Sequence, residues 1–584
     1  MKRTSCFLIA LLVLAVSGMT HAGQLPEYIQ APPMAQVVKT PVGEVKSGPT
    51  KVPMITWAAE VVTIFANGNS LTTVKGSIFD QAGLNLTLFR EDDLKKQVEM
   101  FISGETPYLR VTHGMGNLLL DLLSRDPRTT PVAILQMTWS REGDVLVAKS
   151  HVKTVQDLCG KTIVVQAYGP HVDFFTKVVT DACGSVDKVK VRWVRDLVGL
   201  EGNTPGAAFR LDSSIDAAFV ISPDADALTT VPMIGGRPTP SAEYHVPGAH
   251  KIFSTLTADR IIPDEYWVRS NYLQSHRTEV EKFVHGWLRA DEAVKSLIKT
   301  KQVRAAEYNQ MISAAAKGIF DAVQATADVE GLIGGAEFVG YRGNVKFFSD
   351  PSYPRNFDKL TGEVQTAFMT LGFLSGRVPL DHARWDYNRL KAGLTDIQGV
   401  EAPRFDAAKV AKVIDRKVLK GTLEKEGQFY FEIHFGVNQK TFPADQYREE
   451  FSKVIERATT YGGAVITIEG HSDPYGYWRL VEQLQGQSKE VSEELLRRNL
   501  QAAKDISLGR ANAVRDSVIT AAKEKSITLD PSQFSVHGHG IMRPKSGKIC
   551  QGVGCKPQNK QEQLVNMRVE FRLIVVEAEE EMKE

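Results

Sequence analysis

The sequence predicts an α/β protein in two parts, a two-lobed unit followed by a smaller α+β domain. Three observations lead to this fold class. Strand and helix patterns alternate from residue 53 onward, and two successive strands without a clear helix between them interrupt the alternation once. Near the C-terminus, a strand that ends in a polar turn precedes a helix that carries an arginine. Alternating strands and helices favour parallel sheets covered by helices on both faces.

The first residues have the physical pattern of a signal peptide. Lys2 and Arg3 precede an apolar run at residues 7–16, and Thr20 and Ala22 place small residues near a cleavage position. Such a run is too short to cross about 30 Å of hydrocarbon, and no later segment reaches the roughly 20 apolar residues of a spanning helix. We expect residues 1–22 to be removed and the mature chain to be exported to the periplasm without a transmembrane helix.

Cysteine usage agrees with export. Removal of residues 1–22 takes away Cys6 and leaves two local pairs, 24 and 5 residues apart. These four residues are Cys159, Cys183, Cys550 and Cys555. In an oxidising compartment we expect two disulfides. A zinc site is disfavoured because no second close Cys/His pair has zinc spacing, although His537 and His539 lie nearby. No metal and no cofactor is expected.

Composition excludes several classes of function. The 584 residues suffice for three or four domain-sized units. A net charge of +1 and the absence of a groove with interleaved basic and aromatic residues argue against a nucleic-acid partner. No Gly-x-Ser-x-Gly elbow, His-Glu-x-x-His pair or phosphate-binding loop is present, so we expect no enzymatic activity.

The elements follow in order after an extended, proline-containing arm at residues 23–51. The first series has strands at 54–57, 83–89 and 108–111 and helices at 61–79, 92–102 and 117–123. The two strands that interrupt the series lie at 132–136 and 144–148. The second series has strands at 162–166, 189–193 and 217–221 and a helix at 172–183. A long amphipathic helix at 279–296 and a largely helical stretch to residue 395 complete this unit.

Residues 155–165, 216–223 and 262–287 carry a family resemblance. In their order and spacing they resemble the type II solute-binding proteins of nitrate, sulfonate and taurine importers, over residues 52–395. The resemblance implies a periplasmic-binding-protein fold whose two lobes close on a small solute. It also implies a membrane partner, either a transporter or a signalling complex.

In such a fold, a ligand lies at strand C-termini and helix N-termini, where exposed backbone N–H groups favour an anion. The candidate solute-binding residues in these loops are Trp57, Gly116, Asn117, Tyr168, His171 and Ser222. Each also has a structural explanation, as a core aromatic, a turn glycine or a helix cap. Glu60, Asp224 and Asp226 lie near the same loops with no obvious arginine, which disfavours a bare oxyanion. A small anion (phosphate, sulfonate or nitrate), a zwitterion and an amine-bearing solute therefore remain open.

The C-terminal region carries a second resemblance, through residues 466–473 and 508–514. These segments resemble the OmpA-like peptidoglycan-binding domain, in a region placed at 426–584 after a linker at 396–425. The resemblance implies that Asp473 receives the ammonium of diaminopimelate and that Arg510 binds its carboxylate. Ser472 and Asn512 are expected to add hydrogen bonds.

Two features depart from this family. A charged, helical insertion at 478–505 separates Asp473 from Arg510 by 37 positions, and the closing motif reads Asn566-Met567-Arg568 where a second arginine is usual. The insertion could cap or widen the binding groove.

The leading hypothesis is a periplasmic receptor for a small solute, attached to peptidoglycan through its C-terminal domain. The alternative is an envelope scaffold whose two-lobed unit binds a protein partner. Wall hydrolysis is a third and weaker hypothesis, suggested by His434, His471, His537 and His539. An Asp–Arg pair suits binding better than proton transfer.

Overall fold

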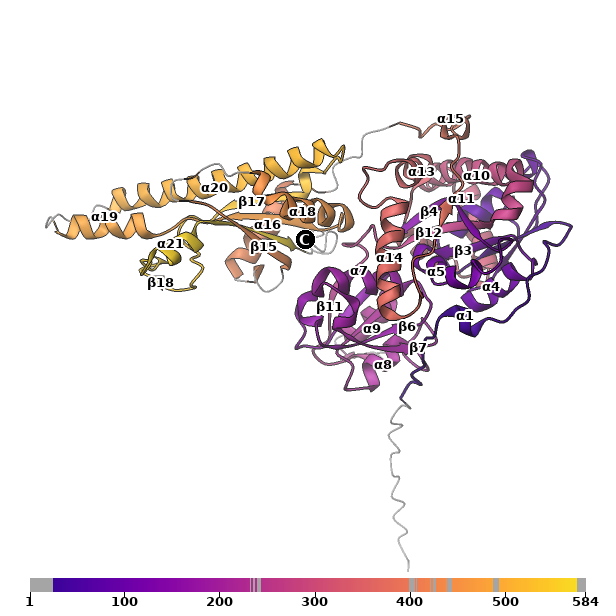
Figure 1. The fold of residues 1–584 in the computed structure, drawn as a ribbon, viewed down its shortest axis with the longest axis horizontal. Helices are drawn as coiled ribbons and strands as arrows, with labels where there is room; N and C mark the ends of the chain where they lie inside the picture. The colour runs from indigo at the N-terminus through magenta and orange to yellow at the C-terminus, as the bar shows by residue number, and fades with distance from the viewer. Residues whose placement is uncertain are drawn as a thin grey trace, which may run out of the picture.

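The computed structural model describes residues 25–231, 233–234, 237–238, 243–398, 405, 407–420, 422–423, 427–436, 439, 444–486 and 493–574. The predicted signal peptide lies outside the described residues, as do parts of the predicted linker and insertion. Two α/β lobes are followed by a C-terminal domain that extends to one side (Figure 1). In the described part of the chain, no helix is both long and apolar enough to cross a membrane.

Lobe 1 is built on a sheet of order β13-β4-β12-β3, with β14 paired to β4 and a separate parallel pair β1-β2. Its strands are β1(Thr50–Met54), β2(Leu86–Arg90), β3(Tyr108–Thr112), β4(Pro131–Ser140), β12(Pro263–Arg269), β13(Ala336–Phe338) and β14(Asp381–His382). The alternation predicts a parallel sheet, but β12 is antiparallel to both β3 and β4. The difference arises because the chain returning from lobe 2 inserts its strand between them.

The helices of lobe 1 cover this sheet. They are α2(Ala59–Ala66), α3(Ile78–Gln81), α4(Leu94–Ile102), α5(His113–Asn117), α6(Leu120–Leu123), α10(Ser270–Lys299), α11(Ala305–Phe320), α12(Thr326–Gly334), α13(Gly340–Ser349), α14(Phe357–Leu371) and α15(Tyr387–Leu390). The single helix expected at 61–79 is wrong, because Gly68, with φ of 88°, follows the end of α2 and leads into a turn. The helix expected at 117–123 also starts earlier, because Thr112 caps α5 through the backbone N–H of Met115.

Lobe 2 has a sheet of order β11-β5-β8-β6-β7, in which β6 is parallel to β7 and β8. Its strands are β5(Asp144–Ala148), β6(Thr162–Gln166), β7(Lys190–Val194), β8(Ala217–Ile221) and β11(His250–Ser254). Its helices are α7(His171–Cys183), α8(Pro205–Leu211) and α9(Ser222–Thr229). The chain crosses from β4 to β5 and returns from β11 to β12. The expected two-lobed fold with a strand crossover is therefore confirmed.

The N-terminal arm lies across both lobes. The Tyr28 hydroxyl donates a 2.6 Å hydrogen bond to Asp212 of lobe 2, and Ile29 forms a bridge with Trp193 of β7. After the short helix α1(Met34–Val37), the backbone N–H of Gly43 donates to the carbonyl of Ile102 in lobe 1. The arm therefore ties the two lobes together on the surface.

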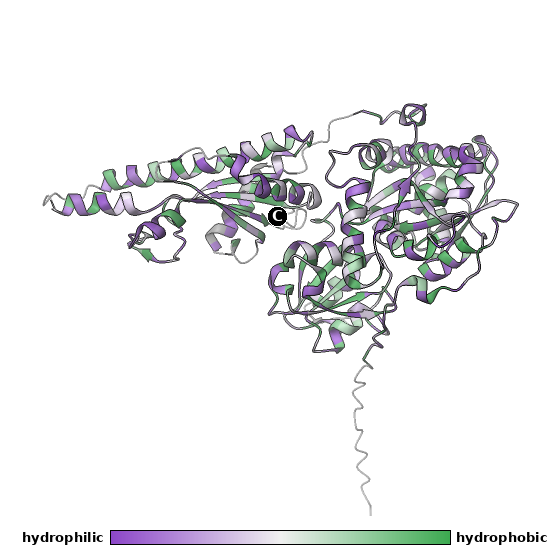
Figure 2. Ribbon diagram, viewed as in Figure 1, coloured by the Kyte–Doolittle hydropathy of each residue, from purple (hydrophilic) through white to green (hydrophobic). Residues whose placement is uncertain are grey.

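The C-terminal domain has a four-stranded sheet of order β15-β20-β16-β17. Its elements are α16(Ala407–Lys420), β15(Gln428–His434), α18(Arg448–Thr460), β16(Val465–Gly470), α19(Tyr475–Gly486), α20(Glu493–Glu524), β17(Phe534–Gly538), β18(Ile549–Cys550), β19(Val553–Gly554), α21(Lys560–Asn566) and β20(Arg568–Ile574). The predicted insertion is a hairpin of α19 and α20 that extends away from the lobes, with hydrophilic and hydrophobic residues along both helices (Figure 2). An α+β domain following the lobes is confirmed.

Both predicted disulfides are present. Cys159 pairs with Cys183 at the end of α7, and Cys550 pairs with Cys555. The second disulfide closes the β18–β19 turn. That turn packs against α19, where the Trp478 indole N–H donates to the carbonyl of Gly554 at 2.7 Å. The disulfide therefore supports the base of the inserted hairpin.

A buried seam joins the C-terminal domain to the lobes. Helix α18 places Arg457 in an ion pair with Asp181 of α7, and the Tyr461 hydroxyl donates to the same carboxylate at 2.6 Å. Tyr461 is fully buried and its ring packs edge-on against Phe253 of β11. The backbone N–H of Gly463 donates to Thr257 in the returning crossover. The domain therefore contacts lobe 2 and the crossover itself.

Candidate functional site

Asp473 and Arg510 lie in the same part of the C-terminal domain. Asp473 follows the end of β16, and its Oδ2 accepts hydrogen bonds from the backbone N–H of Tyr475 and from Gln563 Nε2, each at 3.1 Å. Its Oδ1 has no hydrogen-bond partner. Arg510 projects from α20 and is 2% exposed, with Nε donating to the carbonyl of Gln439 at 3.0 Å and Nη1 to that of His471 at 3.2 Å.

The two charges influence each other without forming an ion pair. Among the residues that the structure describes, neither group has an oppositely charged partner within 4.0 Å. Burial raises the pKa of Asp473, and the positive charge of Arg510 partly opposes that rise. Burial likewise lowers the pKa of Arg510, and the charge of Asp473 opposes that fall. The guanidinium of Arg510 therefore has backbone carbonyl acceptors, and neither it nor Asp473 is neutralised by a charged partner in the described residues.

The two accessory residues expected from sequence make internal contacts. Ser472 Oγ donates to the carbonyl of Ala503 at 3.0 Å, which fixes the strand end to α20. Asn512 Nδ2 donates to the carbonyl of Leu508 within its own helix at 3.1 Å. In the described part of the chain, neither the Ser472 nor the Asn512 side chain forms a hydrogen bond with Asp473.

Other residues complete this site. Gln563 of α21 hydrogen-bonds to Asp473 and orients its carboxylate, and Asn566 at the end of the same helix lowers the pKa of this acid. The guanidinium of Arg510 lies over the ring of Phe435, 5.2 Å from its centroid. Asn566 belongs to the closing motif, so the sequence alone drew attention to it. Nothing in the sequence pointed to Gln563. Met567 of the closing motif is buried.

A buried charge cluster lies beneath this site. Glu469, His471 and Glu570 place possible metal-ligand atoms within 4.8 Å of one another. Both carboxylates already have arginine partners, since Glu469 pairs with Arg543 at 2.9 Å and Glu570 with Arg568 at 2.5 Å. Burial and the neighbouring arginines hold the pKa of His471 well below its usual range. The positive charges surrounding the cluster oppose a cation, so its chemistry favours a structural ion network.

The solute-binding residues expected in lobe 1 serve packing. Trp57 Nε1 donates to Thr138 Oγ1 at 3.0 Å. Gly116 lies against the ring of Trp267, where a Cβ would come within 2.2 Å of a ring carbon. Asn117 is buried, and its Oδ1 accepts a hydrogen bond from Gln365 of α14 at 3.1 Å.

The three expected residues in lobe 2 are also held internally. The Tyr168 hydroxyl donates to the carbonyl of Pro32 in the N-terminal arm at 2.6 Å. His171 is buried between Asp144 and the carbonyl of Phe219, at 2.7 and 3.1 Å. Ser222 Oγ donates to the carbonyl of Glu142. Each of the six residues therefore has an internal hydrogen bond or packing contact in the described part of the chain.

The acids noted near these loops have cationic or backbone partners. Glu60 is buried against Arg110 at 2.5 Å, and Asp226 pairs with Lys251 at 2.6 Å. Asp224 accepts the backbone N–H of Gly199 at 2.8 Å. The expectation that these acids have no arginine nearby is therefore wrong. Arg110 pairs with Glu60, but the two residues are 50 positions apart, so nothing in the sequence indicated that they would meet.

Helix α14 occupies the space between the lobes near α5 and α7. His113 Nε2 lies 3.0 Å from Thr361 Oγ1, and Gln365 of the same helix reaches Asn117. Directly between the lobes, Thr112 donates a 2.6 Å hydrogen bond to Asp173 of α7. The lobes are thus in contact, with α14 packed across their junction.

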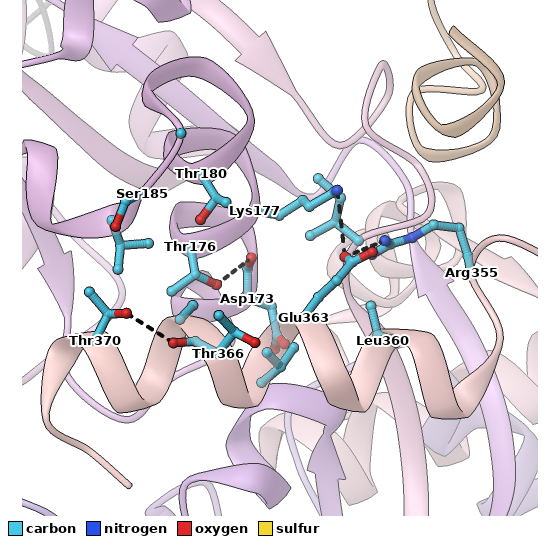
Figure 3. A pocket seen from close by; sticks show the side chains of 15 residues that line it. Asp173, Thr176, Lys177, Thr180, Ser185, Arg355, Leu360, Glu363, Thr366 and Thr370 are labelled. Carbon is cyan, nitrogen blue, oxygen red and sulfur yellow. Dashed lines mark hydrogen bonds and ion pairs between the residues drawn. The ribbon is translucent and has the colours of Figure 1, made fainter. Parts of the chain in front are cut away.

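A pocket of about 220 Å³ remains between α7 and α14 (Figure 3). Helix α7 contributes Asp173 and Lys177, and α14 contributes Glu363 and Thr370. None of the six solute-binding residues expected from sequence lines it. The pocket borders the seam with the C-terminal domain, because Lys177 also pairs with Glu456 of α18 at 2.5 Å.

Comparison with known proteins gives two partial similarities. No protein-family model matches the chain. Outer membrane protein Omp38 of Acinetobacter baumannii, from strains ATCC 17978 and ATCC 19606, is 28% identical over 166 residues, or 28% of this chain. The chain spans 39% of the length of these curated relatives.

Solved structures give weaker similarities. The aliphatic sulphonate binding protein SsuA of Escherichia coli is 11% identical (62% of this chain, 96% of that chain, TM-score 0.37). The nitrate-binding protein NrtA of Synechocystis PCC 6803 is 10% identical (61% and 100%, TM-score 0.34). The desulfurization enzyme DSZB is 14% identical (59% and 99%, TM-score 0.34). Similarity at this level supports no conclusion about ligand or activity. The strand orders described above establish the two-lobed fold.

Proposed function

We propose that this chain is a periplasmic, non-enzymatic binding protein attached to the cell wall. In this proposal the C-terminal domain binds the diaminopimelate of peptidoglycan stem peptides, and the two-lobed unit binds a small solute. The observation that carries the proposal is that the buried Arg510 donates to the carbonyl of His471, two residues before the half-buried Asp473, while neither charge forms an ion pair within 4.0 Å in the described residues. The partial similarity to Omp38 supports a place in the cell envelope.

The physical reason is electrostatic complementarity. A buried guanidinium without a carboxylate partner is unfavourable, and a ligand carboxylate would form charge-assisted hydrogen bonds with it. The unpartnered Oδ1 of Asp473 would accept a hydrogen bond from the ligand ammonium. Gln563 and the backbone N–H of Tyr475 hold the acid in place, so little reorganisation is required on binding.

Co-sedimentation with purified sacculi tests the anchor. The double substitution Asp473→Asn/Arg510→Gln should abolish retention, and free meso-diaminopimelate should compete for the unmodified protein. The matched control is Asp321→Asn/Arg384→Gln, which neutralises one acid and one arginine whose side chains are 77% and 74% exposed in lobe 1. Equal retention of both double variants would reject the anchor. Release of soluble wall fragments would reject the non-enzymatic assignment.

A second candidate function has its own observation. Helix α14 and the arm occupy the junction of the lobes, which favours an envelope scaffold whose two-lobed unit binds a protein. Native mass spectrometry of protein purified from its own periplasm separates the two. A co-purifying small molecule supports the solute receptor, and a bare mass together with a co-purifying protein supports the scaffold.

A further inference from the structure

Tyr475 lies next to the acid of the proposed diaminopimelate site. It is the first residue of α19, and its backbone N–H donates to Asp473 Oδ2 at 3.1 Å. Tyr475 is 40% exposed, whereas Tyr477 of the same helical turn is 8% exposed. Because Tyr475 holds the acid through its backbone, its ring remains open to a ligand of the same site.

One face of this ring carries a cation. Lys556 Nζ lies over the ring, 5.8 Å from its centroid, which is within the range of about 6 Å where an aromatic face attracts a cation. The same Nζ lies 2.7 Å from both carboxylate oxygens of Glu482 in α19. The lysine therefore has a defined place, and it leaves the opposite face of the ring for other contacts.

The disulfide turn holds the lysine in that place. Lys556 directly follows Cys555, which closes the turn with Cys550. The turn is attached to α19 because the carbonyl of Gly554 accepts the indole N–H of Trp478 at 2.7 Å. The ring, the lysine and the first turn of α19 therefore form one preorganised unit, so a ligand that packs against the ring needs little reordering of side chains.

Open space lies beside the ring. A Cβ added to Gly476, the next residue, would meet no atom within 4 Å. A ligand whose ammonium reaches Asp473 would therefore find room for the atoms that follow its charged group. Free diaminopimelate is charged at both ends, whereas in the wall it continues into uncharged peptide units. An aromatic face suits the C–H groups and peptide planes of such a continuation better than a second charge.

We propose that Tyr475 forms a subsite for the stem peptide that continues from the bound diaminopimelate, with its ring packed on the adjoining peptide unit. The inference rests on the proposed wall binding by Asp473 and Arg510 and specifies a further contact at the same site. It gives the site a preference for diaminopimelate held in a peptide over the free amino acid. Helix α19, which belongs to the inserted hairpin, thereby supplies a ligand contact.

Calorimetric titration of the full-length protein tests the subsite. The probes are free meso-diaminopimelate, the tripeptide L-alanyl-γ-D-glutamyl-meso-diaminopimelate, and the same tripeptide linked to its wall disaccharide. Tyr475→Ala should weaken binding of both peptide probes by about fivefold, as expected for the loss of one aromatic contact, and should leave binding of the free amino acid unchanged. Unchanged binding of the free amino acid also shows that the variant is folded.

Two variants control for the ring itself. Tyr475→Phe keeps the aromatic face and should bind the tripeptide as the unmodified protein does. Tyr430→Ala removes another tyrosine of the C-terminal domain, which is 44% exposed and whose ring centroid lies 5.1 Å from Lys545 Nζ. This change should leave all three affinities unaltered. An equal loss in Tyr430→Ala and Tyr475→Ala would overturn the subsite.

The probes separate the subsite from the anchor. If the unmodified protein binds none of them, the proposed wall site fails and the subsite fails with it. If it binds all three and Tyr475→Ala changes nothing, or weakens binding of the free amino acid equally, the anchor stands and the subsite is rejected. A loss confined to the disaccharide probe would also overturn the inference, because the ring would then contact sugar instead of peptide.

Discussion

Arg457 of the C-terminal domain forms a buried ion pair with Asp181 of lobe 2. The guanidinium also stacks over Phe429, 4.6 Å from the ring centroid. Burial by itself would lower the pKa of Arg457. The negative charge of Asp181 more than offsets this effect, so the pKa of Arg457 is raised. The C-terminal domain is therefore joined to the lobes by a specific charge contact as well as by apolar packing.

Arg457→Met should loosen this seam. Removing Arg457 leaves Asp181 with Lys177 and the Tyr461 hydroxyl as its remaining partners, and the expected cost is about 1–3 kcal/mol of domain-docking stability. Arg448→Met is the matched control, because Arg448 on the same helix pairs with Asp445 while both side chains remain exposed, and such pairs contribute roughly 0–1 kcal/mol. Hydrogen exchange should rise in α7 and α18 in Arg457→Met only. Similar exchange in both variants would contradict the docking role.

Wall binding should weaken as pH falls. Burial raises the pKa of Asp473, so this acid takes up a proton at a higher pH than an ordinary aspartate, and the protonated form cannot pair with an ammonium. Arg510 stays charged throughout. Sacculus retention measured from pH 7 downward should therefore fall at a higher pH than an ordinary aspartate would give, and Asp473→Asn should show low retention at every pH. If Asp473→Asn instead shows the same pH profile as the unmodified protein, the pH dependence of retention comes from the sacculus and not from Asp473.

Asp173 should make stability depend on pH. Its folded pKa of about 7 lies above an unfolded value of about 3.9, so the folded state binds more protons between these values. The stabilising contribution of protonated Asp173 is fully present below its unfolded pKa. The free energy of unfolding should therefore fall as the pH rises from about 3.9 toward 7, where the folded protein loses this proton. The charged groups nearby are Lys177 and Glu363 at the pocket and Glu265 in lobe 1, with His113 also close.

Asp173→Asn should flatten this slope in denaturant titrations between pH 4 and 7. Asp516→Asn, at a side chain that is 64% exposed, should leave the slope unchanged. An unchanged slope in Asp173→Asn would place the titration elsewhere.

Removing the Cys550–Cys555 disulfide should affect the insertion locally. The closed loop is short, and loop-closure entropy predicts a loss of only ~2 kcal/mol. Cys550→Ser/Cys555→Ser should increase hydrogen exchange in α19 through the Trp478 contact, while α7 and β12 stay protected. Loss of protection across the whole chain would show that the disulfide supports more than this hairpin.

Local signals in the sequence predicted the parts of the fold that depend on neighbouring residues. The cysteine spacing indicated both disulfides, and the strand-and-turn motif placed Asp473 at the end of β16. Helix–strand alternation indicated two lobes because each βα unit carries its own periodicity.

The parts that sequence did not predict depend on distant partners. Glu60 and Arg110 are far apart along the chain, and helix α14 reaches Asn117 from 248 positions away. The largely helical stretch that reaches residue 395 is expected from sequence only to complete the two-lobed unit, whereas the structure packs its α14 between the lobes. Periodicity predicts that such a helix exists but carries no information about the groove it enters.

The central strand of the first lobe has a consequence for the order of folding. Strand β12 pairs with both β3 and β4, but it follows the whole second lobe along the chain. Synthesis delivers the N-terminal segments first, and long-range strand pairing waits for its partner. The second lobe therefore can complete its sheet while the first is still missing its middle strand, so the part of the protein that begins first is the later of the two to finish.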